Sequence, residues 1–237
     1  VGVIVGAEQQ VAEVAQKVAK DKYGLDVELV TFNDYVLPNE ALSKGDIDVN
    51  AFQHKPYLDQ QIKDRGYKLV SVGNSFVYPI AGYSKKIKSL DELQPGSQVA
   101  IPNDPTNLGR SLLLLQQVGL IKLKEGVGLL PTSLDIIENP KNLKIVELEA
   151  PQLPRSLDDA QIALAVINTT YASQIGLTPA KDGIFVEGKE SPYVNLIVAR
   201  EDNKDAENVK KFVQAYQSDE VYEAANKIFN GGAVKGW

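Results

Sequence analysis

Cysteine is absent from the 237-residue sequence, and histidine occurs once, as His54. The lack of cysteine excludes disulfide bonds, thiolate metal sites and cysteine nucleophiles together. The motifs HExxH, CxxC, GxSxG and GxGxxG and the Walker sequence are also missing, so metalloprotease, redox, hydrolase and nucleotide-binding chemistry has no residue pattern to support it. We therefore expect a protein that is not an enzyme, with no cofactor and no metal ion.

Excess positive charge and long apolar runs are lacking as well. The formal net charge is −6 at pH 7, whereas nucleic-acid-binding proteins usually carry a basic stripe that displaces counterions from phosphates. The most apolar stretch, Leu112–Ile121, is broken by glutamine and glycine and is shorter than the ~18 residues needed to cross a bilayer. The chain begins in an apolar run at Val1 without an initiator methionine, so we expect that an upstream segment has been removed.

Short β-branched runs alternate with helical patterns through the first half of the chain, which is typical of βα units and a largely parallel sheet. The pattern predicts strands at Val1–Gly6, Val27–Phe32, Ile47–Phe52 and Lys68–Val72, and helices at Glu8–Lys22, Asn39–Lys44 and His54–Arg65. A second set has strands at Gln98–Ile101, Leu143–Leu148 and Ile162–Ile167 and helices at Leu108–Val118 and near Leu157–Asp159. These patterns predict an α/β protein with two sheets.

Two extended segments are suited to connect two lobes. We expect Phe76–Tyr83 to lead from the first lobe to the second and Ser191–Arg200 to lead back. The helical tail Ala206–Phe229 carries an apolar face but has no sheet nearby, so we expect it to pack on the first lobe. The predicted organisation is lobe 1 from residues 1–80, lobe 2 from residues 81–191, and a return strand with C-terminal helices from residues 192–237.

The clearest candidate binding motif is the polar segment Asn103–Arg110, which follows a predicted strand and precedes an apolar helix. Open α/β sheets bind ligands at the carboxyl ends of their strands. With Pro102–Asn107 as a loop, the N–H groups of the helix start and the guanidinium of Arg110 could hold a carboxylate. Alternatively, Thr106 or Asn107 only caps the helix and Arg110 pairs with a surface acid.

Aromatic residues mark a second candidate site at neighbouring strand ends. Phe52, His54 and Tyr57 follow the third predicted strand, and Tyr35 follows the second. Two further rings, Phe76 and Tyr78, lie on the outward crossing segment. Each ring taken alone is more often an ordinary core residue, and a lone histidine is more often structural.

Two asparagines interrupt apolar runs. Asn168 ends the predicted strand Ile162–Ile167, and Asn195 lies within the return crossing segment. A buried amide without a hydrogen-bond partner costs about 1–3 kcal/mol. Either backbone groups or a ligand must therefore satisfy these side chains, and the sequence pattern leaves both alternatives open.

Five segments together resemble one known family, the NlpA-type lipoproteins, which are the methionine-binding components of bacterial ABC importers. The segments are Val1–Gly6, Ala51–Tyr57, Asn103–Arg110, Ala165–Ala172 and Ser191–Ile197. The resemblance implies a two-lobed periplasmic-binding fold of type II, in which each lobe is a mixed, mostly parallel sheet flanked by helices and two strands cross between the lobes. It also implies that ligand is contacted by Phe52, His54, Tyr57, Asn107, Arg110, Asn168 and Asn195, with Tyr35 close by.

The resemblance further implies the partners. These are methionine, L- and by extension D-, bound in the cleft between the lobes, and a membrane ABC importer with permease and ATPase subunits. We expect a periplasmic monomer that is attached to the inner membrane only through a lipid anchor upstream of Val1. Two alternatives remain, the effector-sensing domain of a transcription regulator and a small enzyme on the same scaffold. The chain contains no basic helix-turn-helix, a motif that would favour the transcription regulator.

Overall fold

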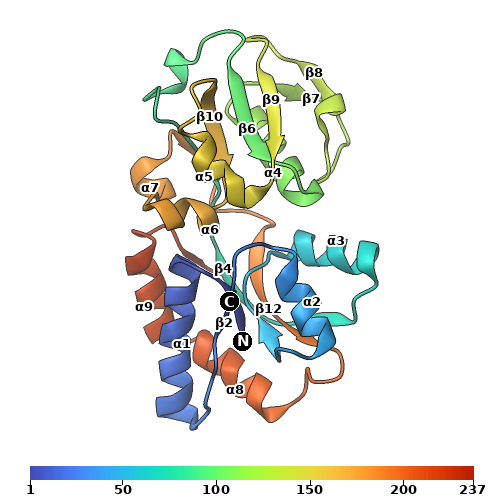
Figure 1. Cartoon of the computed structure of the whole chain (residues 1–237), viewed down its shortest axis with the longest axis vertical. Helices are drawn as coiled ribbons and strands as arrows, with labels where there is room; N and C mark the ends of the chain where they lie inside the picture. Colours follow the sequence, from blue (N-terminus) through green and yellow to red (C-terminus); the bar gives the residue numbers. More distant parts are fainter. The chain divides into compact units, whose positions relative to one another are not determined.

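The chain leaves its first folding unit after Tyr78 and returns to it at Lys189 (Figure 1). Unit 1 contains Val1–Tyr78 and Lys189–Trp237, and unit 2 contains Pro79–Gly188. The computed structural model describes all residues from 1 to 237. None of its helices combines the length and the apolar composition required to span a membrane.

Unit 1 is built around a six-stranded sheet with the strand order β13-β4-β12-β3-β1-β2. The β1–β2 and β1–β3 pairs are parallel, and the β3–β12, β12–β4 and β4–β13 pairs are antiparallel. Its elements are β1 (Gly2–Ile4), α1 (Ala7–Tyr23), β2 (Val30–Phe32), α2 (Leu37–Lys44), β3 (Val49–Asn50), α3 (Lys55–Arg65), β4 (Leu69–Val77), β12 (Val194–Arg200), α8 (Glu207–Tyr216), α9 (Asp219–Ile228) and β13 (Val234–Lys235).

Both faces of this sheet are covered, because strand β12 alternates between two apolar cores. Ile197 and Ala199 face the core formed with α1, α8 and α9, whereas Leu196 and Val198 face the core formed with α2 and α3. The period-2 alternation of a strand puts successive side chains on opposite faces. Figure 1 shows α1, α8 and α9 on one side of the sheet and α2 and α3 on the other.

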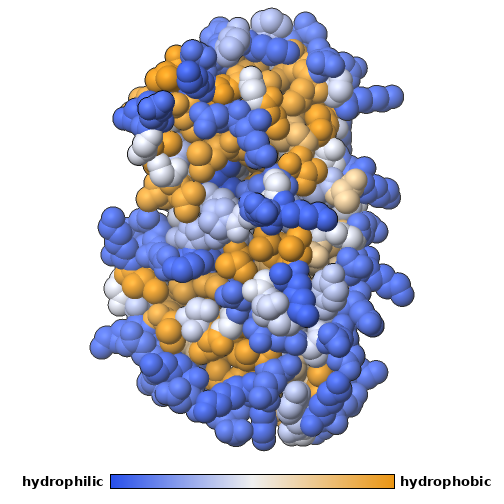
Figure 2. Space-filling model, turned by 180° about the vertical axis from the view of Figure 1, so that it is seen from behind, coloured by the Kyte–Doolittle hydropathy of each residue, from blue (hydrophilic) through white to orange (hydrophobic).

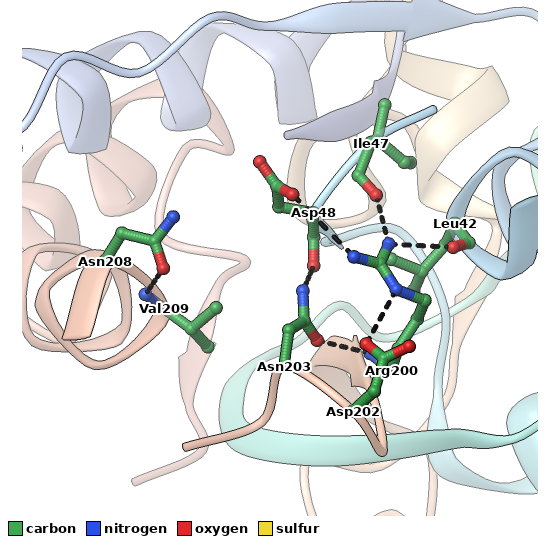
Figure 3. Close-up of polar contacts among 8 residues, drawn as sticks. All are labelled: Leu42, Ile47, Asp48, Arg200, Asp202, Asn203, Asn208 and Val209. Carbon is green, nitrogen blue, oxygen red and sulfur yellow. Dashed lines mark hydrogen bonds and ion pairs between the residues drawn. The ribbon is translucent and has the colours of Figure 1, made fainter. Parts of the chain in front are cut away.

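Arg200, the last residue of β12, holds the segment before β3 through hydrogen bonds to its backbone. Its Nη1 donates to the carbonyl oxygens of Leu42, at 3.0 Å, and Ile47, at 2.7 Å. Asn203 adds a bond from Nδ2 to the carbonyl oxygen of Asp48, at 2.8 Å (Figure 3). These bonds tie the start of β3 to β12, and β3 leads directly into the aromatic segment expected to bind ligand.

Unit 2 contains a five-stranded sheet with the order β11-β5-β10-β6-β9 and a separate pair, β7-β8. The β10–β6 and β6–β9 pairs are parallel, and the β10–β5 and β11–β5 pairs are antiparallel. Its strands are β5 (Ala81–Tyr83), β6 (Gln98–Pro102), β7 (Lys122–Leu123), β8 (Ile136–Glu138), β9 (Lys144–Leu148), β10 (Ile162–Ile167) and β11 (Phe185–Val186). Its α-helices are α4 (Pro105–Gln117), α5 (Leu153–Ser156), α6 (Thr169–Ala172) and α7 (Pro179–Asp182).

Helix α4 covers one face of this second sheet. Leu108, Leu112 and Leu115 form its apolar stripe, and they share a core with Val99 of β6 and Val166 of β10. The spacing of the leucines is that of one helix face. Packing of this stripe sets the direction in which α4 runs from the end of β6, and therefore where the polar residues of its first turns lie.

Mixed sheets are confirmed, but the expectation that they are mostly parallel was wrong. Three of the five pairings in the first sheet and two of the four in the second are antiparallel. The reason lies in the chain path. Strand β4 leads out of unit 1 and β12 leads back into it, so these neighbours run in opposite directions, and β5 and β11 do the same in unit 2.

Several predicted elements differ from the structure, and three of them are helical. Helix α4 begins at Pro105, so Asn107 lies within the helix and not in a loop. The helix near Leu157–Asp159 is instead α5, Leu153–Ser156, with Pro154 in its first turn, where proline is tolerated. The C-terminal tail divides into α8 and α9 because the hydroxyl of Ser218 accepts from the N–H of Val221 and caps a new helix.

The surface carries apolar side chains in patches among charged ones (Figure 2). Leu134 of unit 2 is 95% exposed. The polar residues expected to bind ligand show the opposite behaviour, since Asn107, Arg110 and Asn168 are only 1%, 4% and 5% exposed. Polar groups buried to this extent require partners, and their partners define the candidate site.

Candidate functional site

Five rings of unit 1 form one cluster, with centroids 5.1 to 6.2 Å apart where rings are in contact. Phe52 follows β3, Tyr57 lies in the first turn of α3, and Tyr35 comes from the segment between β2 and α2. His54 contacts the edge of Tyr57 on one side and Tyr193 on the other. Sequence reasoning did not single out Tyr193, which meets His54 only because β12 packs beside that segment.

His54 has a structural role within this cluster. It is the N-cap of α3, and its ring Nδ1 accepts from the backbone N–H of Tyr57, at 3.1 Å. The hydroxyl of Tyr57 in turn donates to the carbonyl oxygen of Tyr35, at 2.9 Å. These two hydrogen bonds fix the mutual position of three aromatic residues.

Three buried side-chain amides form a hydrogen-bond network beside the segment that carries Phe52 and His54. Asn39 of α2, Asn50 of β3 and Gln53 are at most 3% exposed and bond to one another through their side chains, with distances of 2.7 to 3.0 Å. Since Gln53 lies between Phe52 and His54, the network holds both of these residues in place. Sequence reasoning missed it, because the three amides are separated along the chain and none belongs to a recognisable motif.

Phe76 and Tyr78 belong to a different aromatic group. Phe76 is fully buried and packs against Tyr78, Tyr216 and Trp237, with centroids 5.1 to 6.1 Å apart. Tyr78 packs against Phe229 at 4.5 Å, and burial raises the pKa of its hydroxyl well above the ordinary value. These contacts place both residues in the core between β4 and the C-terminal helices, apart from the Phe52 cluster.

In unit 2, Asp104 caps helix α4. Its Oδ2 accepts from the backbone N–H of Asn107, at 3.3 Å, and from the side-chain Nδ2 of the same residue, at 2.8 Å. The cap is neither Thr106 nor Asn107, the two residues that the sequence suggested, because Pro105 occupies the first helical position and the N-cap is Asp104, two residues before Thr106. Burial raises the pKa of Asp104, against the opposing effect of its hydrogen bonds.

Arg110, one turn further along α4, pairs with Glu187. Its Nε donates to Oε2, at 2.9 Å, and its Nη2 to Oε1, at 2.7 Å. The side chains are 4% and 11% exposed, so this is a buried ion pair and not the surface pair considered from the sequence. The pairing takes two of the five guanidinium donors and orients the group. No sequence signal identifies Glu187, which lies 77 residues away.

Asn168 lies at the end of β10 and meets the first turn of α4. Its Nδ2 donates to Oδ1 of Asn107, at 3.1 Å, while its own Oδ1 is buried and has no hydrogen-bond partner. The structure thus brings Asn107 and Asn168 together, and it places Arg110 on the same face of α4 three residues after Asn107. Unit 2 thereby presents a cation and an amide acceptor from adjoining elements.

Asn195 lies on β12 in unit 1, where its backbone forms an isolated β-bridge with His54. The bridge joins it to the aromatic cluster. Its side-chain amide makes none of the hydrogen bonds that hold the fold together, and the residue is only half-buried. A half-buried amide can bond to water as well as to a ligand, so the structural and the binding alternatives both stay open for Asn195.

The residues of each unit, taken separately, suit recognition of part of a ligand. No three His, Cys, Asp or Glu side chains are placed to hold a metal ion. Two cavities within the units, of about 270 and 670 Å³, are lined by other residues than the predicted ones. Unit 1 offers an aromatic surface, and unit 2 offers a guanidinium and an amide oxygen. An apolar, polarisable side chain suits the first set, and a carboxylate with an ammonium group suits the second.

Comparison with known proteins identifies similar chains. The family model described as NlpA lipoprotein matches residues 1–237. The D-methionine-binding lipoprotein MetQ of Escherichia coli K12 is 94% identical over 237 residues, which are 100% of this chain and 88% of that protein.

Two solved structures are also similar. A nutrient-binding protein from Burkholderia cenocepacia bound to methionine is 54% identical, with a TM-score of 0.96, covering 100% of this chain and 98% of that one. A periplasmic substrate-binding protein of an ABC transporter from Coxiella burnetii is 51% identical, with a TM-score of 0.95, covering 99% and 98%.

Proposed function

The chain belongs to the NlpA lipoprotein family, and from this premise we propose that it is the substrate-binding protein of an ABC importer and that its substrate is methionine. The 94% identity to a methionine-binding lipoprotein and the likeness to a methionine-bound structure support this proposal. These relatives are binding proteins, which agrees with the absence of catalytic motifs. We propose that the chain is likewise not an enzyme.

We propose that the two sets of residues suit different parts of the ligand. The rings of Tyr35, Phe52, His54 and Tyr57 contact the thioether, since sulfur and aromatic faces attract one another by about 0.3–1.5 kcal/mol per contact. Arg110, oriented by Glu187, binds the carboxylate. Phe76 and Tyr78 pack in the core against Tyr216 and Phe229, so we assign them no contact with the ligand.

We assign the ammonium group to Oδ1 of Asn168, which is buried and has no hydrogen-bond partner. This acceptor is the observation that carries the proposal, because Asn168 bonds to Asn107 on α4, the helix that also carries Arg110. An α-amino acid brings a carboxylate and an ammonium group two bonds apart, and it needs a donor and an acceptor placed accordingly. Asn195 adds an amide from unit 1 that can bond to the amino-acid backbone of the ligand.

The cellular role follows from the same relatives. We propose a periplasmic monomer that delivers methionine to the permease and ATPase subunits of the importer. The lipoprotein relatives support attachment to the inner membrane through a lipid on a segment upstream of Val1. The ABC-transporter protein from Coxiella burnetii supports the transport assignment.

Isothermal titration calorimetry with a ligand series tests the proposed function. L-methionine is expected to bind more tightly than norleucine, which lacks sulfur, and norleucine more tightly than alanine. Methionine sulfoxide should bind poorly, because its oxygen must be desolvated among rings. D-methionine measures the stereochemical preference. Equal affinity for alanine and methionine would remove the thioether pocket, and mass spectrometry of molecules released on denaturation would identify any other ligand.

A further inference from the structure

A chain of side-chain hydrogen bonds runs through unit 2 from a carboxylate to an amide. Asn107 donates from Nδ2 to Oδ2 of Asp104, at 2.8 Å, and Asn168 donates from Nδ2 to Oδ1 of Asn107, at 3.1 Å. The series ends at Oδ1 of Asn168, which is buried and has no partner. All three residues lie at the adjoining ends of β6 and β10, and both asparagines are at most 5% exposed.

The direction of these bonds follows from the chemistry of the first residue. An ionised carboxylate can only accept, so the amide of Asn107 must turn its NH₂ group toward Asp104 and its oxygen away. That oxygen then accepts a hydrogen bond from the NH₂ group of Asn168, and the oxygen of Asn168 is left without a partner. An asparagine amide by itself is nearly symmetric in shape and could adopt either orientation.

We propose that Asp104 is a positioning residue for ligand selection: through Asn107 it fixes the amide of Asn168 with the oxygen toward the ligand, so that unit 2 accepts an ammonium group and rejects ligands that lack one. This inference rests on the proposed function, since it assigns the acceptor for the ammonium of the amino acid. In this scheme Asp104 contacts no ligand atom and acts through Asn107 and Asn168.

Helix capping alone does not account for Asp104. Asparagine, serine and aspartate are about equally good N-caps, so the cap position does not require a carboxylate. The bond from Oδ2 to the capped backbone N–H is 3.3 Å, longer than the 2.8 Å bond to the Asn107 side chain. Burial also makes the ionised form costly, as the raised pKa of Asp104 shows. Of the two contacts, the closer is the one to the Asn107 side chain, which a serine, although an equally good cap, is too short to make.

Two substitutions separate the roles. Asp104→Ser keeps a good cap but is too short to reach Nδ2 of Asn107, so the amides lose their fixed orientation. Asp104→Asn keeps an oxygen that can take the place of Oδ2 and should preserve it. Asp135→Ser is the matched control, because Asp135 of unit 2 also accepts from a backbone N–H, that of Thr132 at 2.8 Å, but is not part of the series.

The experiment measures the affinity of each purified variant for L-methionine and for 4-(methylsulfanyl)butanoate, which is methionine without the amino group. Asp104→Ser is expected to weaken methionine binding about 10-fold or more, the scale of one hydrogen bond to a charged group. Its affinity for the desamino compound should stay within about threefold of the wild type, and Asp104→Asn and Asp135→Ser should retain the wild-type preference for methionine.

Three results would overturn the inference. Equal losses for both ligands in Asp104→Ser would mean that Asp104 only supports the fold. A loss in Asp104→Asn as large as in Asp104→Ser would mean that the negative charge acts through space and not by orienting amides. Unchanged selectivity in Asp104→Ser would remove the residue from recognition. If the wild type binds no methionine, the proposed function itself fails, which is a separate outcome.

Discussion

Replacing Arg110 and Glu187 singly and together separates the stabilising role of this pair from its role in binding. In Arg110→Ala the carboxylate of Glu187, whose side chain is 11% exposed in the pair, loses its arginine partner. Breaking a buried ion pair in this way costs about 3–5 kcal/mol. For a chain of 237 residues, at roughly 2–4 °C per kcal/mol, the ligand-free melting temperature should fall by about 6–20 °C.

The double variant Arg110→Met/Glu187→Leu removes both charges and fills the space with apolar atoms. Substitutions of this kind are often neutral or stabilising, so its ligand-free melting temperature should lie near that of the wild type. Methionine binding should nevertheless weaken by about 10- to 150-fold, corresponding to about 1.5–3 kcal/mol for a lost charge-assisted hydrogen bond. Arg110→Lys should recover only part of the affinity, because an ammonium group cannot bind two oxygens side by side.

Circular dichroism melting of ligand-free protein and calorimetric titration with methionine provide the two readouts. A double variant that binds methionine as tightly as the wild type would refute the assignment of Arg110 to the ligand carboxylate. An Arg110→Ala variant that melts at the wild-type temperature would instead refute the structural role of the pair. The two conclusions are independent, since each depends on a different measurement.

Asn195→Ala should leave the ligand-free melting temperature nearly unchanged and reduce the rise in melting temperature on adding methionine; a lowered ligand-free midpoint with an unchanged rise would contradict this. Gly109→Ala should destabilise the protein by about 1–2 kcal/mol, because the added Cβ would overlap the carbonyl oxygen of Leu129, whereas the control Gly188→Ala, with no atom closer than 3.9 Å, should be neutral in urea unfolding. Because burial raises the pKa of Asp104, its ionised form costs stability at neutral pH, and this cost disappears as pH falls through the raised pKa. Ligand-free Asp104→Asn should therefore melt at or above the wild-type temperature at pH 7, with a difference that shrinks on acidification; a growing difference would show that the sign is wrong.

Much of the fold was predictable from local patterns. Apolar residues at helical spacing identified the body of α4, and β-branched runs identified β6, β9 and β10 to within about two residues at each end. The mixed α/β class with two sheets followed from the order of these elements. Strand direction was less accessible, because antiparallel pairing depends on where the chain leaves and re-enters a unit, which no local pattern encodes.

The candidate site shows the same division. Phe52 and Phe76 look alike in sequence, since each is a ring beside an apolar strand, yet one joins the Tyr57 cluster and the other is enclosed by the C-terminal helices. Arg110 and Asn168 were recognisable as polar residues at strand ends and helix starts. Their partners Glu187 and Asn107 were not, because the pairs are 77 and 61 residues apart.

The spacing of apolar residues, together with the residues that end helices and strands, therefore determined which segments are helices and strands. The same local patterns showed which element ends carry polar groups, because each depends on only a few consecutive residues. Tertiary structure alone decided that Glu187 orients Arg110, that the Asp104 carboxylate controls the amide of Asn168, and that Tyr193 completes the ring cluster. The physical reason is that hydrogen bonds and ring contacts act over a few ångströms in space. Only packing of the sheets and helices brings such distant residues within that range.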